Sequence, residues 1–258
     1  MRAGVIGIGL IGGSIARGLG DAIVFDANEH SLKAAEAVGL TVAASIDEIA
    51  NTVDVLVIAV PFGAFDQVLA EVVTASARRE KPLLVTNVLS VMSTPSINEP
   101  NVHFVSGHPM AGTEHSGFEA SDPKLFVGKT WVLAESNAVI EGLVEALGAE
   151  PVVVPAARHN EIVAQVSHLP HLIAAAEVLA VPSEDFYRLA ASSFADSTRV
   201  AATLAELTAG MVEANRVEAL AAIERFQAVL EQFADQLRAG ESVRDLFARA
   251  KDLRDKNL

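Results

Sequence analysis

Short apolar runs alternate with helical patterns along the first 155 residues of the chain. The apolar runs, which are typical of buried strands, lie at 3–6, 22–25, 53–60, 83–86, 102–105, 129–134 and 151–154. Helical patterns fall between several of them, at 31–38, 46–50, 63–79 and 137–147. Because strands that alternate with helices form parallel sheets covered on both faces, this part of the chain is predicted to be an α/β domain.

After residue 155 the patterning is helical throughout. This change predicts a second, all-helical domain, so that the two domains are 1–155 and 156–258. One long helix is expected from about 205 to 239, with a stripe of apolar residues three and four positions apart: Ile223, Phe226, Leu230, Phe233 and Leu237. Such a stripe is typical of a core or a subunit seam, and it predicts a homodimer formed through the helical domain.

The first strand runs directly into a glycine-rich turn. Gly7 permits a tight turn, Gly9 lets the backbone approach a pyrophosphate, and Gly12 lets the following helix pack closely on the strand. The second strand ends at Asp26, where a carboxylate can accept hydrogen bonds from an adenosine ribose. The spacing predicts a Rossmann-like dinucleotide-binding domain. Since the acid would repel a 2′-phosphate, NAD is favoured over NADP.

The composition excludes several classes of protein. The 258 residues carry a net charge of −14, which argues against nucleic acid as a partner because phosphate binding needs a basic surface. Cysteine is absent, so no disulfide, thiol nucleophile or thiolate metal site is expected. The apolar stretches are shorter than a membrane span, and the N-terminus shows no signal-peptide pattern. We therefore expect a soluble, cytoplasmic protein that does not associate with membranes.

A glycine-rich segment at 107–117 follows the apolar run 102–105 and contains His108. Taken alone, it is equally well interpreted as a polar turn with a solvated histidine or as a loop that binds a ligand at the carboxyl edge of the sheet. Ser90 follows the run 83–86, and its hydroxyl is predicted to reach the same edge.

Two pairs of polar residues stand out in the helical domain. His168 and His171 flank Pro170, which is expected to kink the helix. One of them can be a packing residue, and because nothing nearby completes a metal site, no metal is predicted. Asp196 and Arg199 are three positions apart. They form either a surface ion pair or an acid that orients a guanidinium toward a substrate carboxylate, and the residues alone leave both interpretations open.

Four motifs together resemble the prephenate/arogenate dehydrogenase family of tyrosine biosynthesis, over nearly the whole chain. They are Gly-Ile-Gly-Leu-Ile-Gly-Gly-Ser at 7–14, Gly-His-Pro-Met-Ala-Gly-Thr-Glu at 107–114, Ser-His-Leu-Pro-His at 167–171 and Asp-Ser-Thr-Arg at 196–199. The resemblance implies an NAD-dependent oxidoreductase that oxidatively decarboxylates prephenate to 4-hydroxyphenylpyruvate. Arogenate, which would give tyrosine directly, is the alternative substrate.

The resemblance also implies a role for individual residues. His108 would take the proton of the substrate hydroxyl, a task that suits a neutral imidazole at physiological pH, and Ser90 would contact that hydroxyl and the cofactor. The residues implied to bind the substrate are His171, Arg199, Thr113, Glu114 and Asp196. Those implied to contact the dinucleotide are Gly7, Gly9, Ile11, Gly12, Asp26 and Pro61.

The chain departs from the family pattern in places. Asn87 and Met92 stand where many members have an aspartate and a lysine, and a lysine common just ahead of Asp196 is absent. These departures weaken any inference about ion-pair gating and leave the choice of substrate open. The alternatives are a β-hydroxyacid dehydrogenase or related reductase, which typically uses a lysine that residues 156–200 lack, and a catalytically silent NAD-sensing protein.

Overall fold

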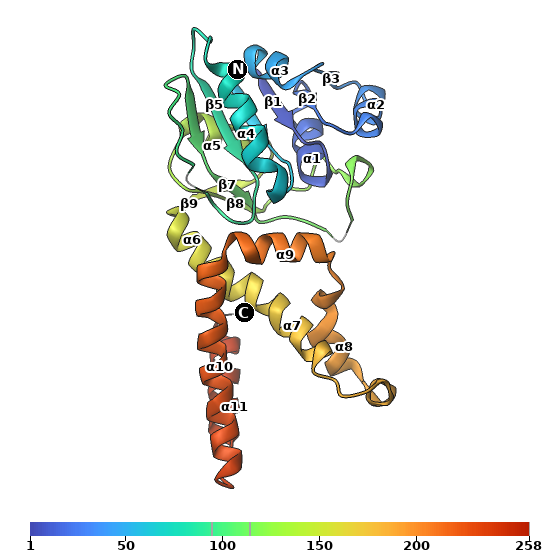
Figure 1. Ribbon diagram of the computed structural model, residues 1–258, viewed down its shortest axis with the longest axis vertical. Coiled ribbons are helices and arrows are strands. Elements are labelled where there is room, and N and C mark those ends of the chain that lie inside the picture. Colours follow the sequence, from blue (N-terminus) through green and yellow to red (C-terminus); the bar gives the residue numbers. More distant parts are fainter. Residues whose placement is uncertain (94, 114, 258) are drawn as a thin grey trace.

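The computed structural model describes residues 1–93, 95–113 and 115–257, and it shows an α/β domain followed by a helical domain (Figure 1). This arrangement confirms the predicted fold class, a Rossmann-like domain followed by an all-α domain. The last strand, β9 (Glu150–Val153), ends just before the first helix of the second half, α6 (Ala156–Val163).

The main sheet has six parallel strands in the order β3-β2-β1-β4-β5-β6. Their bounds are β1 (Ala3–Ile6), β2 (Ile23–Phe25), β3 (Thr41–Val42), β4 (Val55–Ile58), β5 (Leu83–Asn87) and β6 (Val102–Val105). Starting from β1, the chain first adds strands on one side, β2 and β3, and then on the other, beginning with β4. The carboxyl ends of β1 and β4 therefore flank a switch point, which is where open α/β sheets bind their ligands.

Helices cover both faces of this sheet (Figure 1). On one face, α1 (Leu10–Leu19), α2 (Glu29–Ala37) and α5 (Ala138–Ala146) share an apolar core with the strands, to which Ile15 of α1 and Leu143 of α5 contribute. On the other face, α3 (Ile46–Thr52) and α4 (Phe62–Ser76) contribute Ile49 and Phe65 to a second apolar core. Burial on both sides explains why the central strands are almost entirely apolar.

A smaller, three-stranded sheet holds His108. It consists of β7 (Gly107–Pro109), β8 (Thr130–Leu133) and β9, with β7 antiparallel to β8 and β8 parallel to β9. His108 lies opposite Val132 in this sheet. The expectation that His108 lies in an irregular loop is therefore wrong, because backbone pairing with β8 makes its segment a short strand and holds its backbone in place.

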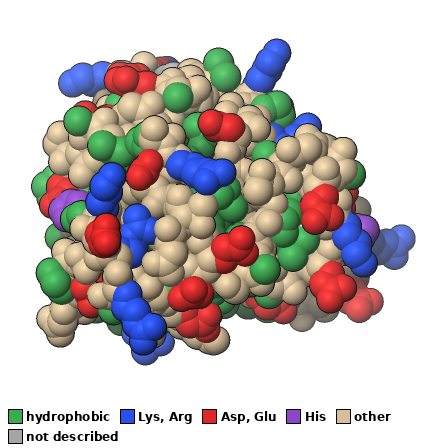
Figure 2. Space-filling model, turned by 90° about the horizontal axis from the view of Figure 1, so that it is seen from above, with side chains coloured by type: hydrophobic (Ala, Val, Ile, Leu, Met, Phe, Trp, Pro, Cys, Tyr) green, Lys and Arg blue, Asp and Glu red, His purple; other side chains and the backbone are tan. Residues whose placement is uncertain are grey.

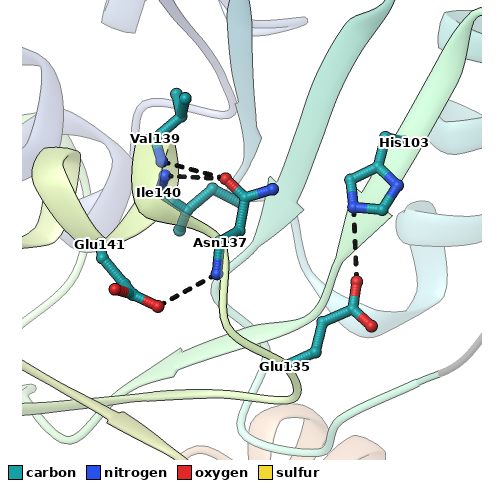
Figure 3. A network of polar contacts seen from close by, with 6 residues as sticks. All are labelled: His103, Glu135, Asn137, Val139, Ile140 and Glu141. Carbon is teal, nitrogen blue, oxygen red and sulfur yellow. Dashed lines mark hydrogen bonds and ion pairs between the residues drawn. The ribbon is translucent and has the colours of Figure 1, made fainter.

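The segment before α5 forms polar contacts with α5 and with β6 (Figure 3). The side chain of Asn137 accepts hydrogen bonds from the backbone N–H groups of Val139 and Ile140, at 3.1 and 3.3 Å, and so caps the helix. Just upstream, His103 Nε2 of β6 lies 3.4 Å from Glu135 Oε1. Both contacts belong to the α/β domain, and none of these residues lines the cleft described below.

The helical domain begins with one continuous helix. It consists of α6, a π-helical turn η2 (Ala164–His168) and α7 (Leu169–Leu179). Pro170 lies in the first turn of α7, and the π-helical turn directly precedes that helix. By length and composition this helix, Ala156–Leu179, is the described segment that could cross a membrane, but it carries the buried His159 and His168.

Six further helical elements follow α7 in the described part of the chain. They are η3 (Glu184–Leu189), α8 (Ser192–Thr198), η4 (Arg199–Ala202), α9 (Ala205–Ala214), α10 (Arg216–Arg238) and α11 (Arg244–Asn257). Figure 1 shows α9 lying across the foot of the α/β domain, whereas α10 extends away from it. Phe233 of α10 contacts Phe247 of α11, with ring centroids 5.3 Å apart.

The expected single helix at 205–239 is wrong, because the chain breaks at Asn215 between α9 and α10. Asn215 has φ −111° and ψ 34°, outside the helical range, and it is buried. Its Nδ2 donates a hydrogen bond of 2.8 Å to the backbone carbonyl of Asn160 in α6. This contact between helices accounts for the break.

The end of the α/β domain that faces away from the helical domain carries mixed charges (Figure 2). In this view, Lys and Arg side chains are interspersed with Asp and Glu, and the visible face has no continuous basic area.

Candidate active site

A cleft of about 2140 Å³ lies between the carboxyl edge of the main sheet and helix α9. Its walls include many of the residues singled out from the sequence: Gly7, Gly9, Ile11, Asp26, Pro61, Ser90, His108 and Thr113. Sites for small ligands usually measure about 300–1,000 Å³, so this cleft has room for a dinucleotide together with a small substrate.

The glycine turn leaves the start of α1 open to a ligand. Gly7 has φ +86°, a conformation that favours glycine, and a Cβ at Gly12 would lie only 1.8 Å from the Gly7 carbonyl oxygen. Gly9 is the N-cap of α1, and no side chain caps that helix. The backbone N–H groups in the first turn of α1 therefore remain available to an anion such as a phosphate.

Asp26 closes the other side of this turn. One carboxylate oxygen accepts a 2.7 Å hydrogen bond from Ile8 N–H, and the other accepts a 2.8 Å bond from Asn28 N–H. The carboxylate therefore shapes the glycine turn and faces the cleft at the same time. Each oxygen has a further lone pair, so Asp26 can still accept hydrogen bonds from ribose hydroxyls.

Asn87, at the end of β5, binds the two residues that precede His108. Its Oδ1 accepts hydrogen bonds from Gly107 N–H at 2.9 Å and from the Ser106 hydroxyl at 3.1 Å. Gly107 itself is tightly enclosed, because a Cβ there would lie 3.0 Å from Trp131 Nε1. Asn87, which replaces an aspartate common in the resembling family, thus fixes the backbone beside His108.

His108 pairs with a histidine from the helical domain. His108 Nδ1 lies 2.9 Å from Nε2 of His159 in α6, and His159 Nδ1 lies 3.1 Å from Asn160 Oδ1. The amide of Asn160 is oriented by Met92, whose N–H donates to Oδ1 and whose carbonyl accepts from Nδ2, both at 2.9 Å. The chain of contacts thus crosses from one domain to the other and back.

These contacts determine where the protons lie. Because Asn160 Oδ1 can only accept, His159 Nδ1 must donate to it, and Nε2 of a neutral His159 is then an acceptor. His108 Nδ1 must in turn donate to His159, which leaves His108 Nε2 with a free lone pair. A half-buried imidazole in this tautomer can accept a proton from a ligand in the cleft.

The histidines of this cluster are held neutral. Burial and, to a lesser extent, the neighbouring His159 and His168 together lower the pKa of His108 from 6.5 to about 3. Burial also lowers the pKa of His168 to about 4, with additional effects of His171 and His159. The pKa of His159 is lowered by burial as well, against the opposing effect of its hydrogen bond to Asn160. His108 is therefore a proton acceptor at neutral pH.

Comparison with known families decides the class of this protein. A model of the prephenate dehydrogenase nucleotide-binding domain matches residues 16–148, and a model of the prephenate dehydrogenase dimerization domain matches residues 155–250. The chain belongs to the prephenate dehydrogenase family. Membership confirms the predicted nucleotide-binding role of the first domain and the predicted enzyme class, an oxidoreductase of tyrosine biosynthesis.

The relatives similar to this chain are named after different substrates. The chain is 29% identical to a prephenate dehydrogenase of Lactococcus lactis, over 97% of this chain and 75% of that protein. It is 30% identical to a cyclohexadienyl dehydrogenase of Zymomonas mobilis, over 88% of this chain and 85% of that protein. The solved structure of an arogenate dehydrogenase of Synechocystis is similar with a TM-score of 0.83 at 26% identity, over 100% of both chains.

Some residues expected at the site of this family member lie outside the cleft. His171 on α7 is half-buried, with Nδ1 buried and without a hydrogen-bond partner among the described residues, and it does not line the cleft. Asp196 and Arg199 are exposed on α8 and η4, also outside the cleft lining, and they form no ion pair with each other in the described chain. Glu114 lies outside the described residues.

His159 is the site residue that sequence reasoning missed. His168 lies nine positions after His159, which is about two and a half turns of a regular α-helix and would place the two on opposite sides. The π-helical turn at 164–168 adds a residue to one turn and rotates His168 back toward His159. A polar His-Asn pair just after the domain boundary was the available signal, but its contact with His108 depends on tertiary structure.

Acid should destabilise the protein through these histidines. In the unfolded chain they titrate near 6.5, whereas the pKa of His168 is lowered to about 4 in the folded chain. The unfolded chain therefore binds more protons between these pH values, and stability that is complete above pH 6.5 is lost as the pH falls toward 4. For each histidine the slope approaches about 1.4 kcal/mol per pH unit.

Urea unfolding from pH 7.5 to 4.5 measures this slope. The variant His168→Gln lacks one of the titrating groups, so its unfolding free energy should depend less steeply on pH than that of the wild type. The comparison removes the contribution of carboxylates, which both proteins share. Parallel curves for the two proteins would contradict the lowered pKa of His168.

Proposed function

We propose that this enzyme oxidises prephenate to 4-hydroxyphenylpyruvate and CO2, with NAD as hydride acceptor. The observation that carries the proposal is His108, which lines the same cleft as the glycine turn and whose Nε2 remains free because Nδ1 donates to His159. A base in this position suits an alcohol oxidation, in which the hydroxyl loses its proton while the carbon loses hydride.

The residues present fit NAD. The uncapped start of α1 offers N–H groups to the pyrophosphate, Gly9 has open space around its α-carbon, and Asp26 offers its carboxylate to the ribose. An acid at that position disfavours the 2′-phosphate of NADP. NAD, when bound, accepts the hydride from the substrate ring.

The chain's own residues handle the hydroxyl proton. His108 Nε2 accepts the hydrogen bond of the ring hydroxyl and takes its proton as hydride departs. The carboxylate then leaves as CO2, its bonding electrons complete the aromatic ring, and the phenolate regains the proton from His108. Ser90 also lines the cleft, and its hydroxyl would donate to or accept from the same oxygen. Thr113 contributes a polar group to the substrate side.

Arogenate is the second candidate because of two acids in the cleft wall. Glu206 and Glu213 of α9 both line the cleft. Arogenate carries an ammonium group where prephenate has a ketone, and a carboxylate near that group would attract the ammonium and disfavour the ketone. The inferred chemistry at His108 is the same for either substrate.

A direct assay tests the proposal. The purified protein is mixed with NAD and either prephenate or arogenate, and NADH formation is followed by absorbance, with NADP in parallel. We expect turnover with NAD and at least one of the two substrates. Normal NAD binding without turnover on either substrate would contradict the proposed activity and favour an NAD-sensing protein.

We propose that Arg199 binds a substrate carboxylate after the helical domain moves toward the cleft. Arg78, just beyond α4, is the only arginine or lysine among the described residues that line the cleft, so a substrate with two carboxylates needs a further cation. Arg199→Ala should raise KM about 10- to 100-fold with little effect on kcat, since a charged hydrogen bond contributes about 1.5–3 kcal/mol.

The matched control for Arg199→Ala is Arg188→Ala. Arg188 is an exposed arginine of the same domain, on η3, and also lies outside the cleft lining. Both variants are measured by steady-state kinetics with the preferred substrate. An unchanged KM in Arg199→Ala would exclude this residue from substrate binding.

We propose a homodimer that forms through the helical domain and remains in the cytoplasm. The stripe predicted from the sequence divides along α10: Ile223 and Phe226 pack in the core of the domain, whereas Leu230 and Leu237 are 56% and 64% exposed. Exposed leucines seven positions apart on one face of a helix are typical of a subunit interface. Sedimentation equilibrium that gives the mass of one chain at working concentrations would contradict the dimer.

A further inference from the structure

We propose that Asn160 is a positioning residue that fixes the loop carrying Ser90 and the tautomer of His108 at the same time. The inference rests on the proposed function, because it assigns His108 and Ser90 to one reaction. Asn160 itself is half-buried and does not line the cleft, so it would act only through its neighbours.

The first contact of Asn160 is with the loop that follows β5. Its side-chain amide forms a reciprocal pair with the backbone of Met92: Met92 N–H donates to Oδ1 and Nδ2 donates to the Met92 carbonyl, both at 2.9 Å. Met92 is buried and lies two residues after Ser90. A side chain from the helical domain thus holds the backbone next to the serine of the α/β domain.

The second contact is with His159. Oδ1 of Asn160 accepts from His159 Nδ1 at 3.1 Å in addition to Met92 N–H, so both lone pairs of this oxygen are used. His159 in turn accepts from His108 Nδ1. Because the Met92 pair orients the amide, it also determines the direction of both hydrogen bonds in the chain to His108.

A third contact holds the backbone of Asn160. Asn215, at the break between α9 and α10, donates from Nδ2 to the Asn160 carbonyl at 2.8 Å, and the same Nδ2 lies 3.4 Å from His168 Nδ1. Asn160 is therefore linked to the loop after β5, to the catalytic pair and to the helix that walls the cleft. A group that only filled space would not need partners on all three.

The charge of the side chain at this position matters as much as its shape. A carboxylate here would have no proton to donate to the Met92 carbonyl, and it would favour a protonated His159. The titratable groups that face His159 are His108 from β7 and His168 from η2, and both are held neutral by burial. A protonated His159 would donate from Nε2 to His108, so the remaining proton of His108 would occupy the nitrogen that must act as base.

Asn160→Asp and Asn160→Ala separate charge from position. In Asn160→Asp the acidic limb of the kcat/KM profile should move to higher pH by at least about one unit, the lower end of the shift that a neighbouring opposite charge produces. In Asn160→Ala the limb should move less, while kcat falls about 10²-fold at the optimum pH, the loss expected from a small misplacement of the reacting groups. NAD affinity should not change in either variant.

The matched control is Asn137→Ala. Asn137 also bonds to backbone groups, as the cap of α5 (Figure 3), but it does not line the cleft and forms no hydrogen bond with His108, His159 or His168 in the described part of the chain. This variant should keep the wild-type kcat and pH profile. The positioning role would be overturned if Asn160→Asp had the same pH profile of kcat/KM as Asn137→Ala. It would also be overturned if Asn160→Ala kept the wild-type kcat.

A measurement without turnover separates this inference from the proposed function. Long-range proton–nitrogen NMR correlation shows which imidazole nitrogen carries the proton in the folded protein. We expect protonation at Nδ1 of both His108 and His159 in the wild type, and a raised pKa of His159 in Asn160→Asp. Protonation of His108 at Nε2 in the wild type would overturn the inference, whereas absent turnover with the expected tautomers would contradict only the proposed function.

Discussion

Replacing His108 with asparagine is expected to lower kcat by about 10²–10⁴-fold, the usual contribution of a general base. Asparagine retains a polar group of similar length that can bond to His159, but it cannot take a proton from the substrate hydroxyl. The affinity for NAD should stay close to that of the wild type, because the glycine turn and Asp26 do not contact His108 in the hydrogen bonds of the described chain. Stopped-flow and steady-state measurements of NADH formation give kcat, and calorimetric titration gives the affinity for NAD.

The control for this variant is His103→Asn. His103 is a histidine of the same domain, on the neighbouring strand β6, where it pairs with Glu135 and is exposed (Figure 3). Its replacement should leave kcat unchanged. If His108→Asn kept more than a tenth of the wild-type kcat, His108 would not be the base, and the free Nε2 of its imidazole would need another explanation.

The α/β domain could be predicted from the sequence because its signals are local. An apolar run of four to six residues bounded by turn residues specifies a strand without reference to the rest of the chain, and the glycine turn between β1 and α1 depends on residues at most six positions apart. Asp26 lies 19 positions after Gly7, and it could be placed beside that turn because a dinucleotide-binding βαβ unit has a regular spacing. Ser90 and His108 could be assigned to one edge because parallel strands end together.

The contact between His108 and His159 could not be predicted in this way. It joins residues 51 positions apart, and it requires the two domains to meet at a definite angle. The π-helical turn further changes which helix face each histidine occupies, and nothing in the local sequence specifies one extra residue in a turn. Only the resemblance to a family suggested that this region takes part in the site.

The break at Asn215 could not be predicted from the local sequence either. Asparagine is only mildly unfavourable inside a helix, so the sequence from 205 to 239 is compatible with one continuous helix. The hydrogen bond of Asn215 to Asn160 and its burial between helices decide the local conformation instead. The break turns α9 across the cleft, so a wall of the site depends on a tertiary contact rather than on helix propensity.

Replacing Gly12 with alanine should lower both the unfolding free energy and the affinity for NAD. The added Cβ would lie 1.8 Å from the carbonyl oxygen of Gly7, so α1 must move away from the glycine turn. Overpacking of this kind costs about 1–3 kcal/mol or more of unfolding free energy, although alanine is otherwise the better helix former. Because the start of α1 is displaced, NAD binding should be lost as well. Urea unfolding and calorimetric titration with NAD measure the two effects.

Gly9→Ala separates packing from ligand contact. A Cβ at Gly9 has no atom of the protein within 4 Å, so the unfolding free energy should change by no more than about 0.5 kcal/mol. The methyl group would nevertheless occupy the space through which the backbone approaches the pyrophosphate, and the affinity for NAD should fall at least tenfold, about 1.4 kcal/mol. A stable Gly9→Ala variant with wild-type affinity would show that the pyrophosphate does not lie against this turn, whereas Gly12→Ala would remain destabilised because its clash lies within the protein.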